Sequence, residues 1–356
     1  MSRQRQSQFR NRNTTRSHLL EDFRSHRYPN LQLNEIVSHT VEFARDHDGS
    51  KFIQRKLDDA TENRKDAIFR EMRPHLVSLT MDAFANFVVQ KFFDVGNESQ
   101  KHEIVALLRN GFVQFSLNKY ACRVVQKAIE KSTVMQQISI FGDVSQDQIL
   151  RLFVDSNGNH VIQKFFTCTF FDIQEFLFRQ IRGRIYELCM NLYGCRVIQC
   201  ILKKGALAHR MEIFNEIFPH SMDLVTHRYG NYVMQNTILH CPPYQQMRLI
   251  TLILTEMHVL SQHKYSSNVI EKCLTVGVQV TPHILLDTFQ KICALNAHDL
   301  KILCMDAFAN YVMQKMIELM APWMAIDLYQ KLRPFFVEMK RTVCGRKIID
   351  MLIERQ

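Results

Sequence analysis

The sequence predicts an all-α solenoid, in which short helical repeats stack one upon the next. Two observations carry this prediction: a five-residue motif recurs eight times at nearly constant spacing, and a helix-capping residue precedes most copies. The successive spacings are 36, 36, 37, 36, 36, 36 and 43 residues. A third observation agrees, because the 356 residues include only 11 Gly and 8 Pro, the residues that interrupt helices.

Each copy of the motif has apolar third and fourth residues and ends at Gln, or at Glu in the seventh copy. The copies are Ser50–Gln54, Asn86–Gln90, Cys122–Gln126, Asn159–Gln163, Cys195–Gln199, Asn231–Gln235, Ser267–Glu271 and Asn310–Gln314. A Gly, Ala or Ser precedes every copy, and the residue four places before it is Asp or Asn in six copies and His in two. We therefore expect each copy to begin a capped helix whose apolar side faces the next repeat.

The segments around the copies predict the rest of the array. Amphipathic stretches between copies, such as 101–108 and 245–254, predict the packing helices of each repeat. The ends of a solenoid need caps for solubility, and residues 344–349 resemble the motif without its Gln. The predicted order is a flexible basic arm (1–16) and one domain (17–356), composed of an N-terminal cap (about 17–38), repeats (about 39–334) and a C-terminal cap (about 335–356).

The last spacing is seven residues longer than the usual 36. We expect this extra length to form a longer loop, around Thr275–Pro282 or around Leu295–Leu300. Insertions in solenoids lie on the surface and often mark a binding face.

Composition restricts the class of function. The net charge of +10 suggests nucleic acid or another acidic partner, although a basic protein without such a partner fits the charge equally well. The ten Cys include no CxxC pair, so we expect reduced, buried thiols and no metal site. No nucleophile–base set or Gly-rich phosphate loop is present, so we expect neither an enzyme nor a cofactor. No apolar run approaches 18 residues and no signal peptide opens the chain, which favours an intracellular protein without a membrane anchor.

Three positions of each copy form the candidate binding site. In a helix the first and fifth residues share a face and the second lies about 100° further round, so we expect all three on one exposed edge. The residues expected to contact base edges are Ser50, Gln54, Asn86, Gln90, Cys122, Gln126, Asn159, Gln163, Cys195, Gln199, Asn231, Gln235, Ser267, Glu271, Asn310 and Gln314. The residues expected to stack on bases are Lys51, Phe87, Arg123, His160, Arg196, Tyr232, Asn268 and Tyr311.

The chemistry of the first and fifth residues varies in a way that suits different bases. Asn with Gln can span the mixed donor and acceptor edge of uracil, and Gln beside a small Cys or Ser can both accept from and donate to adenine. A carboxylate accepts two hydrogen bonds, which suits guanine alone. A basic residue follows six copies and either lines the same groove for phosphates or is simply solvated; these residues are Arg55, Lys91, Lys127, Lys164, Lys272 and Lys315.

These residues resemble the RNA-binding domain of the Pumilio (PUF) family from about residue 18 to the end of the chain. The resemblance implies a right-handed crescent of eight three-helix repeats, with single-stranded RNA antiparallel on its concave face and the 5′ base at the eighth repeat. It implies the site 5′-UGUAUAUA-3′, of the general form UGUANAUA with tolerance at the fifth base. Lys51 departs from the family's usual Arg, which puts strong recognition of the last adenine in doubt.

The resemblance also implies a biological role: a cytoplasmic monomer that binds 3′ untranslated regions and represses or destabilises mRNA. It implies Nanos-like, cytoplasmic polyadenylation-element-binding and deadenylase-complex proteins as partners on the convex face near repeats seven and eight. Two other functions compete with this one. An armadillo or HEAT-like protein scaffold accounts for the period but not for the recurring Gln, and a ribosome-biogenesis factor without sequence preference does not require eight intact motifs.

Overall fold

The computed structural model of the protein describes residues 16–141 and 144–355. These residues contain helices and connecting turns and no β-strand, which confirms the all-α prediction. They fall into two compact units, one ending at Gln148 and one beginning at Ile149. Nearly all of the predicted basic arm, residues 1–15, lies outside the described residues.

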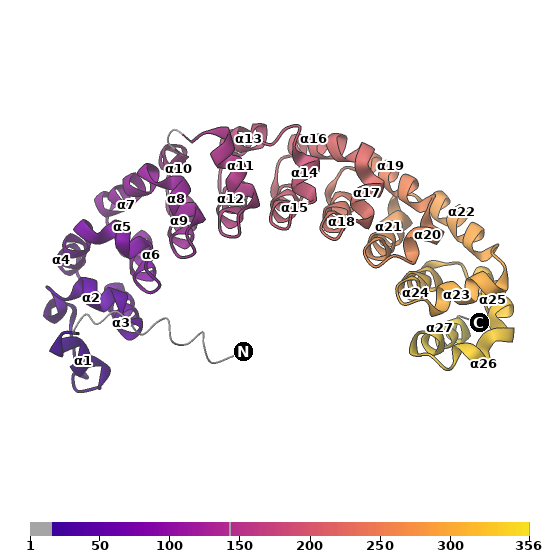
Figure 1. The fold of residues 1–356 in the computed structure, drawn as a ribbon, viewed down its shortest axis with the longest axis horizontal. Helices are drawn as coiled ribbons and strands as arrows, with labels where there is room; N and C mark the ends of the chain where they lie inside the picture. Colours follow the sequence, from indigo (N-terminus) through magenta and orange to yellow (C-terminus); the bar gives the residue numbers. More distant parts are fainter. Residues whose placement is uncertain (1–15, 142–143, 356) are drawn as a thin grey trace. The chain divides into compact units, whose positions relative to one another are not determined.

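Each repeat contains a short first helix, a motif helix that carries one copy of the five-residue motif, and a third helix (Figure 1). The first helices are α2 (Thr40–Arg45), α5 (Leu76–Thr80), α8 (Phe112–Leu117), α11 (Gln146–Val154), α14 (Ile185–Cys189), α17 (Ser221–Thr226), α20 (Met257–Ser261) and α23 (Ala297–Met305). The motif helices are α3 (His47–Asp58), α6 (Ala85–Val95), α9 (Ala121–Lys131), α12 (Gly158–Cys168), α15 (Gly194–Lys204), α18 (Gly230–His240), α21 (Ser266–Val280) and α24 (Ala309–Leu319). The third helices are α4 (Glu62–Met72), α7 (Glu98–Asn110), α10 (Val134–Phe141), α13 (Phe171–Arg179), α16 (Leu207–Ile217), α19 (Pro243–Leu254), α22 (Pro282–Cys293) and α25 (Pro322–Leu332).

Further helices stand at the two ends of the chain and between some repeat helices. The N-terminal segment contributes α1 (His18–Arg24), and the C-terminal segment contributes α26 (Phe336–Met339) and α27 (Val343–Glu354). Short 3-10 turns occupy η1 (Leu33–Ile36), η2 (Arg73–His75), η3 (Phe218–His220) and η4 (Arg333–Phe335). Among the helices described, none has both the length and the apolar run needed to span a bilayer.

Successive motif helices pack side by side within each unit. In the first unit α3 contacts α6 and α6 contacts α9, and in the second the contacts run from α12 through α15, α18, α21 and α24 to α27. The third and fourth motif residues supply the contact surface; Val88 and Val89, for example, are completely buried. This burial of one apolar face against the next repeat is what holds a solenoid together, since each repeat touches only its neighbours.

The capping residues work as the sequence predicts. The Asp82 carboxylate accepts hydrogen bonds from the backbone N–H groups of Phe84 (2.8 Å) and Ala85 (2.9 Å). The same pair of bonds recurs at Asp46, Asn118, Asp155, Asn191 and Asp306. Histidine replaces the oxygen with a ring nitrogen: Nδ1 of His227 accepts from Tyr229 and Gly230 at 3.3 and 3.2 Å. These bonds are longer than those of the Asp and Asn caps, so histidine caps the helix less well.

A close backbone approach requires the small residue before each copy. A Cβ added at Gly230 would lie 2.8 Å from the carbonyl oxygen of Leu224, which is closer than real Cβ contacts come. The equivalent oxygen in the next repeat, that of Leu260, accepts a hydrogen bond from the Ser266 hydroxyl at 2.5 Å. The start of each motif helix therefore packs on the end of its own first helix.

The expected longer loop after the seventh copy is wrong. Helix α21 has 15 residues where most motif helices have 11, and α23 has nine where most first helices have five or six. The extra residues are therefore helical. Pro282 stands at the start of α22, and the N–H of Thr281 still bonds to the carbonyl of Gly277, so the chain turns only after α21 has gained one more turn.

Candidate nucleic-acid interface

The three motif positions differ in exposure, which corrects the expectation of one shared exposed edge. All eight first residues are buried, with exposures between 0 and 5%, whereas Phe87, Tyr232 and Tyr311 in second place are at least half exposed. Seven of the fifth residues are half-buried, and Gln314 is buried. The exposed edge therefore consists of the second and fifth residues, and the first residue lies beneath it.

Four copies place Asn beneath Gln, and the structure joins the two side chains. Asn86 donates through Nδ2 to the carbonyl oxygens of Asp82 (2.8 Å) and Ala83 (3.1 Å), which fixes its amide. Its Oδ1 then accepts from Nε2 of Gln90 at 2.9 Å. The same Asn–Gln bond occurs at Asn159–Gln163, Asn231–Gln235 and Asn310–Gln314. The Asn orients the Gln, whose Oε1 and second N–H have no partner among the described residues and can bind a ligand.

Copies with a small first residue hold Gln in another way. Nε2 of Gln54 donates to the backbone carbonyl of Ser50 at 3.1 Å, and Nε2 of Gln126 donates to that of Cys122 at 3.0 Å. The Ser50 hydroxyl in turn donates to the His47 carbonyl. Among the described residues, Oε1 and the second N–H of Gln54 and of Gln126 have no partner, and more space remains beside these side chains because Ser and Cys are smaller than Asn.

Glu271 is the only carboxylate in fifth place. Burial raises its pKa above the ordinary value, against the opposing effect of Lys315 and Lys272. A half-buried acceptor with no partner of its own in the repeat favours a ligand that donates hydrogen bonds.

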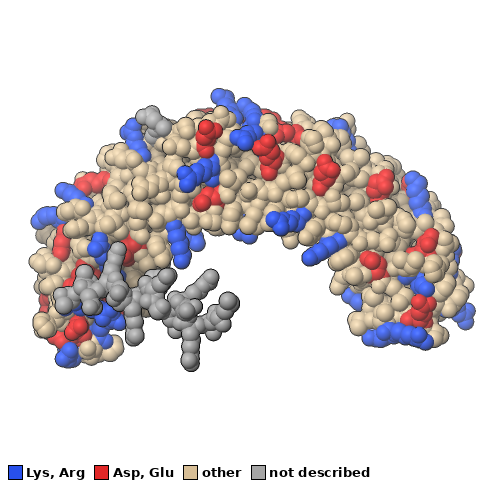
Figure 2. Space-filling view, viewed as in Figure 1, with Lys and Arg blue, Asp and Glu red and all other residues tan. Residues whose placement is uncertain are grey.

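The second residues project from the motif helices as the sequence predicts. Lys51, Phe87, Arg123, Arg196, Tyr232, Asn268 and Tyr311 are exposed and His160 is half-buried. Most carry a flat ring, guanidinium or amide, and Lys51 has no such plane. Figure 2 shows Lys and Arg side chains at the edge along which the motif helices lie in each unit.

In several copies the sixth residue, directly after the motif, contacts the preceding repeat. Lys91 Nζ lies 2.5 Å from a carboxylate oxygen of Asp58, and Lys127 Nζ lies 2.8 Å from that of Asp94. Lys91 and Lys127 are therefore engaged in ion pairs rather than simply solvated, and phosphate contacts of the basic sixth residues stay a prediction.

Asn236 is a sixth residue that sequence reasoning missed. Its Nδ2 donates to Oε1 of Gln199 in the preceding repeat at 3.3 Å and to the carbonyl of Tyr232 at 2.7 Å. It therefore orients the fifth residue of its neighbour. In the sequence, the only sign of this role is the Asn itself, since six of the other copies have Lys or Arg at the sixth position.

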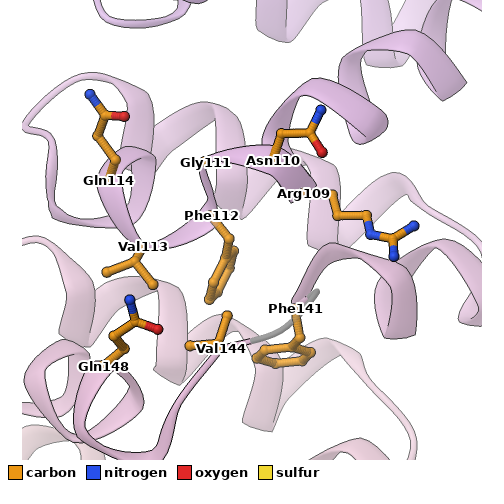
Figure 3. A pocket seen from close by; sticks show the side chains of 9 residues that line it. All are labelled: Arg109, Asn110, Gly111, Phe112, Val113, Gln114, Phe141, Val144 and Gln148. Atoms are coloured by element: carbon orange, nitrogen blue, oxygen red, sulfur yellow. The ribbon is translucent and has the colours of Figure 1, made fainter.

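A pocket of about 480 Å³ lies away from the motif helices, at the junction of α7 and α8 (Figure 3). The Phe112 and Phe141 rings, 5.3 Å apart, and Val144 form its apolar floor, while the side chains of Arg109 and Gln114 point away from that floor. It brings together no predicted site residue.

Cysteines and other possible metal ligands are dispersed. All ten Cys are free thiols and seven are buried; burial raises the pKa of the Cys241 thiol to about 12 and that of Cys293 to about 11. Among the described residues, no three His, Cys, Asp or Glu side chains are placed to hold a metal ion together.

Comparison with known proteins gives a family match along most of the chain. The Pumilio-family RNA binding repeat matches residues 39–73, 75–108, 111–145, 154–182, 184–218, 220–254, 257–281 and 302–322, and each match contains one motif copy. A Pumilio domain-containing protein of Schizosaccharomyces pombe is 30% identical over 325 residues, which cover 91% of this chain and 46% of that protein. Pumilio homolog 1 of Xenopus laevis is 37% identical over 188 residues, 53% of this chain and 10% of that protein. The chain thus spans less than half the length of these relatives.

Two solved structures resemble the fold closely. The Puf3 RNA binding domain bound to the Cox17 RNA 3′ UTR recognition sequence site B is 30% identical with a TM-score of 0.84, covering 94% of this chain and 100% of that one. PUF-8 in complex with PBE-RNA is 31% identical, also with a TM-score of 0.84, covering 95% of this chain and 99% of that one.

Proposed function

Since the chain belongs to the Pumilio family of RNA-binding repeat proteins, we propose that it binds single-stranded RNA with the sequence 5′-UGUAUAUA-3′, one base per repeat. The observation that carries this proposal is the arrangement of the eight copies: a buried first residue, a second residue that is exposed in seven copies and half-buried at His160, and a fifth residue that can form hydrogen bonds. Proteins built of such repeats read each base with two or three side chains of one repeat. The related Puf3 and PUF-8 proteins are bound to RNA in their structures.

The Asn–Gln copies suit uracil. The Gln that Asn86 orients presents one acceptor and one donor, which match the N3–H and a neighbouring carbonyl of uracil. Asn also fills space beside the Gln, which favours a pyrimidine over a larger purine. We assign uracil to the pairs Asn86–Gln90, Asn159–Gln163, Asn231–Gln235 and Asn310–Gln314, with the fifth base, at Asn159–Gln163, the most tolerant.

The copies with Ser or Cys suit purines. Beside Cys122 the extra space admits a purine, and the free Oε1 and N–H of Gln126 match N6 and N1 of adenine. We assign adenine to Ser50–Gln54, Cys122–Gln126 and Cys195–Gln199. Glu271 above Ser267 accepts from both N1–H and N2–H of guanine, so this copy takes the second base. The exposed second residues lie between successive bases and stack on them, with Lys51 the weakest.

We further propose that binding to such elements in 3′ untranslated regions represses or destabilises cytoplasmic mRNA, and that the chain acts as a monomer with partner proteins. An apolar pocket of about 300 Å³ supports a partner site near repeats seven and eight. Val278, from the added turn of α21, lines it with Leu286 and Phe289. Trp323 is exposed on α25 nearby. Nanos-like and deadenylase-complex proteins are the partners that we propose for this surface.

Binding of short RNAs at one fixed salt concentration tests the RNA proposal, because phosphate contacts make affinities salt-dependent. We expect UGUAUAUA to bind tightly and ACAAUAUA to bind more weakly by several kcal/mol, at about 1–3 kcal/mol per mismatched base. Equal affinities for both RNAs would refute sequence-specific reading and favour the scaffold or the unspecific ribosome-biogenesis function.

A further inference from the structure

A pocket of about 370 Å³ lies between the N-terminal segment and motif helix α3, within the first unit. Phe23 and Tyr28 line it from the N-terminal segment, and Phe52, Arg55 and Lys56 line it from α3. Aromatic rings together with cationic groups are the combination that binds single-stranded nucleotides elsewhere.

The local fold explains why this pocket is open. Helix α1 ends at Arg24, and His26 adopts a left-handed conformation with φ of 57°, which turns the chain. The Phe23 ring packs on Phe52 with centroids 5.1 Å apart and holds the segment in place. Tyr28, beyond the turn, remains 45% exposed beside the opening.

Arg55 differs in its surroundings from two of the equivalent residues. It is the sixth residue of the first copy, and its counterparts Lys91 and Lys127 are paired with acids of the preceding repeat. Among the described residues, Arg55 forms no ion pair. Its guanidinium lines the pocket instead.

The position of the pocket relative to the bases follows from helix geometry. Lys51 and Gln54 on α3 face the last base of the proposed site, and Arg55 lies one turn along from Lys51, on the same face. Helix α6, which reads the seventh base, packs on α3, whereas the pocket lies against the N-terminal segment. A strand that leaves the eighth base therefore passes the pocket next.

We infer that this pocket binds a ninth nucleotide, directly 3′ of the octamer; this inference rests on the proposed function. The base stacks on Tyr28, and its phosphate lies near Arg55. Asp59 also lines the pocket. A carboxylate can only accept hydrogen bonds when ionised, so a base with an amino group is favoured over uracil. The site thus extends the preferred RNA to UGUAUAUA followed by A, C or G.

Binding of five RNAs tests the inference: the octamer, the octamer followed by A, by U or by an abasic nucleotide, and a variant with ACA in place of UGU. For the natural protein we expect the added A to increase affinity about tenfold, the scale of one stacked base. The added U should increase it less, and the abasic nucleotide least.

Variants separate the two parts of the pocket. Tyr28→Ala should abolish the advantage of A over the abasic nucleotide, and Arg55→Gln should reduce the gain from every added nucleotide. Tyr28→Ala should bind the octamer as the natural protein does, which also reports on folding, and the gain for Arg55→Gln is measured against this variant's own affinity for the octamer. Tyr244→Ala and Arg109→Gln, an exposed tyrosine and an arginine lining another pocket, are the matched controls and should keep the full gain.

The outcomes distinguish the two proposals. If the natural protein prefers UGU to ACA but gains nothing from a ninth nucleotide, or if the gain survives both Tyr28→Ala and Arg55→Gln, the inferred pocket is wrong. If it does not distinguish UGU from ACA, the proposed function fails and this inference fails with it.

Discussion

Changing the second copy to resemble the seventh should change the base that it selects. The variant N86S/F87N/Q90E gives α6 the residues of Ser267, Asn268 and Glu271. The new carboxylate would accept from N1–H and N2–H of guanine but would face the O2 and O4 acceptors of uracil. An unpaired buried acceptor costs about 1–3 kcal/mol, so affinity for UGUAUAGA should exceed that for UGUAUAUA by about 5- to 150-fold. The natural protein should show the opposite preference.

The structure also gives the expected stability of this variant. Asn86 makes two hydrogen bonds to the carbonyls of Asp82 and Ala83, and a serine there keeps one of them, as Ser50 does with His47. The bond from Gln90 to Asn86 is lost as well. The net loss is therefore two hydrogen bonds, so the free energy of unfolding should fall by about 1–3 kcal/mol. Val88 and Val89 are unchanged, and the packing between repeats should therefore persist.

Fluorescence anisotropy with both RNAs and both proteins, at one salt concentration, measures the preference. N86S alone serves as the control. Its free energy of unfolding should also fall, but it should not acquire a preference for guanine. The assignment of this repeat to the seventh base would be wrong if the triple variant kept its preference for uracil there while still selecting UGU.

Three further predictions concern single side chains. Glu271→Gln should abolish the preference for guanine at the second base. Because burial raises the pKa of Glu271, the preference of the natural protein for guanine should weaken as the pH falls toward that raised pKa. Binding titrations of the variant should show no such pH dependence. Burial and Arg228 lower the pKa of His227, so its cap is intact above about pH 6.5 and is lost as the pH falls through the lowered value. His227→Asn should therefore raise the free energy of unfolding in urea by about 0.5–1 kcal/mol at pH 7.5, and by more at pH 5.5; lower stability at both would contradict this. Leu286→Asp should leave the affinity for RNA unchanged but abolish co-purification of a Nanos-like or deadenylase-complex partner. Weaker RNA binding by a folded variant would count against a separate partner surface.

The sequence predicted what depends on local patterns. Caps such as Asp82 and small residues such as Gly230 act within one repeat, so their spacing alone indicates where each motif helix begins. The apolar residues Val88 and Val89 likewise indicate which side of the helix is buried. These local signals repeat eight times, and the repetition made the fold class clear.

What the sequence did not predict depends on neighbouring elements. Helical periodicity gives the angle of Asn86 round its axis but not that the preceding turn covers it and bonds its amide. The same limit applies to Lys91, whose partner Asp58 lies in another repeat. Nothing in residues 275–280 indicates a loop or a helix strongly, and only packing decided that α21 continues.

The contact from Asn236 to Gln199 has a consequence for the independence of the repeats. If each repeat were a separate module, exchanging one motif would change one base and leave the others alone. Here the sixth repeat fixes the side chain with which the fifth repeat meets its base, so the two positions share a coupling energy. Mismatches at these two adjacent bases should not simply add, and a new specificity engineered at α15 must be chosen together with the residue at 236 on α18.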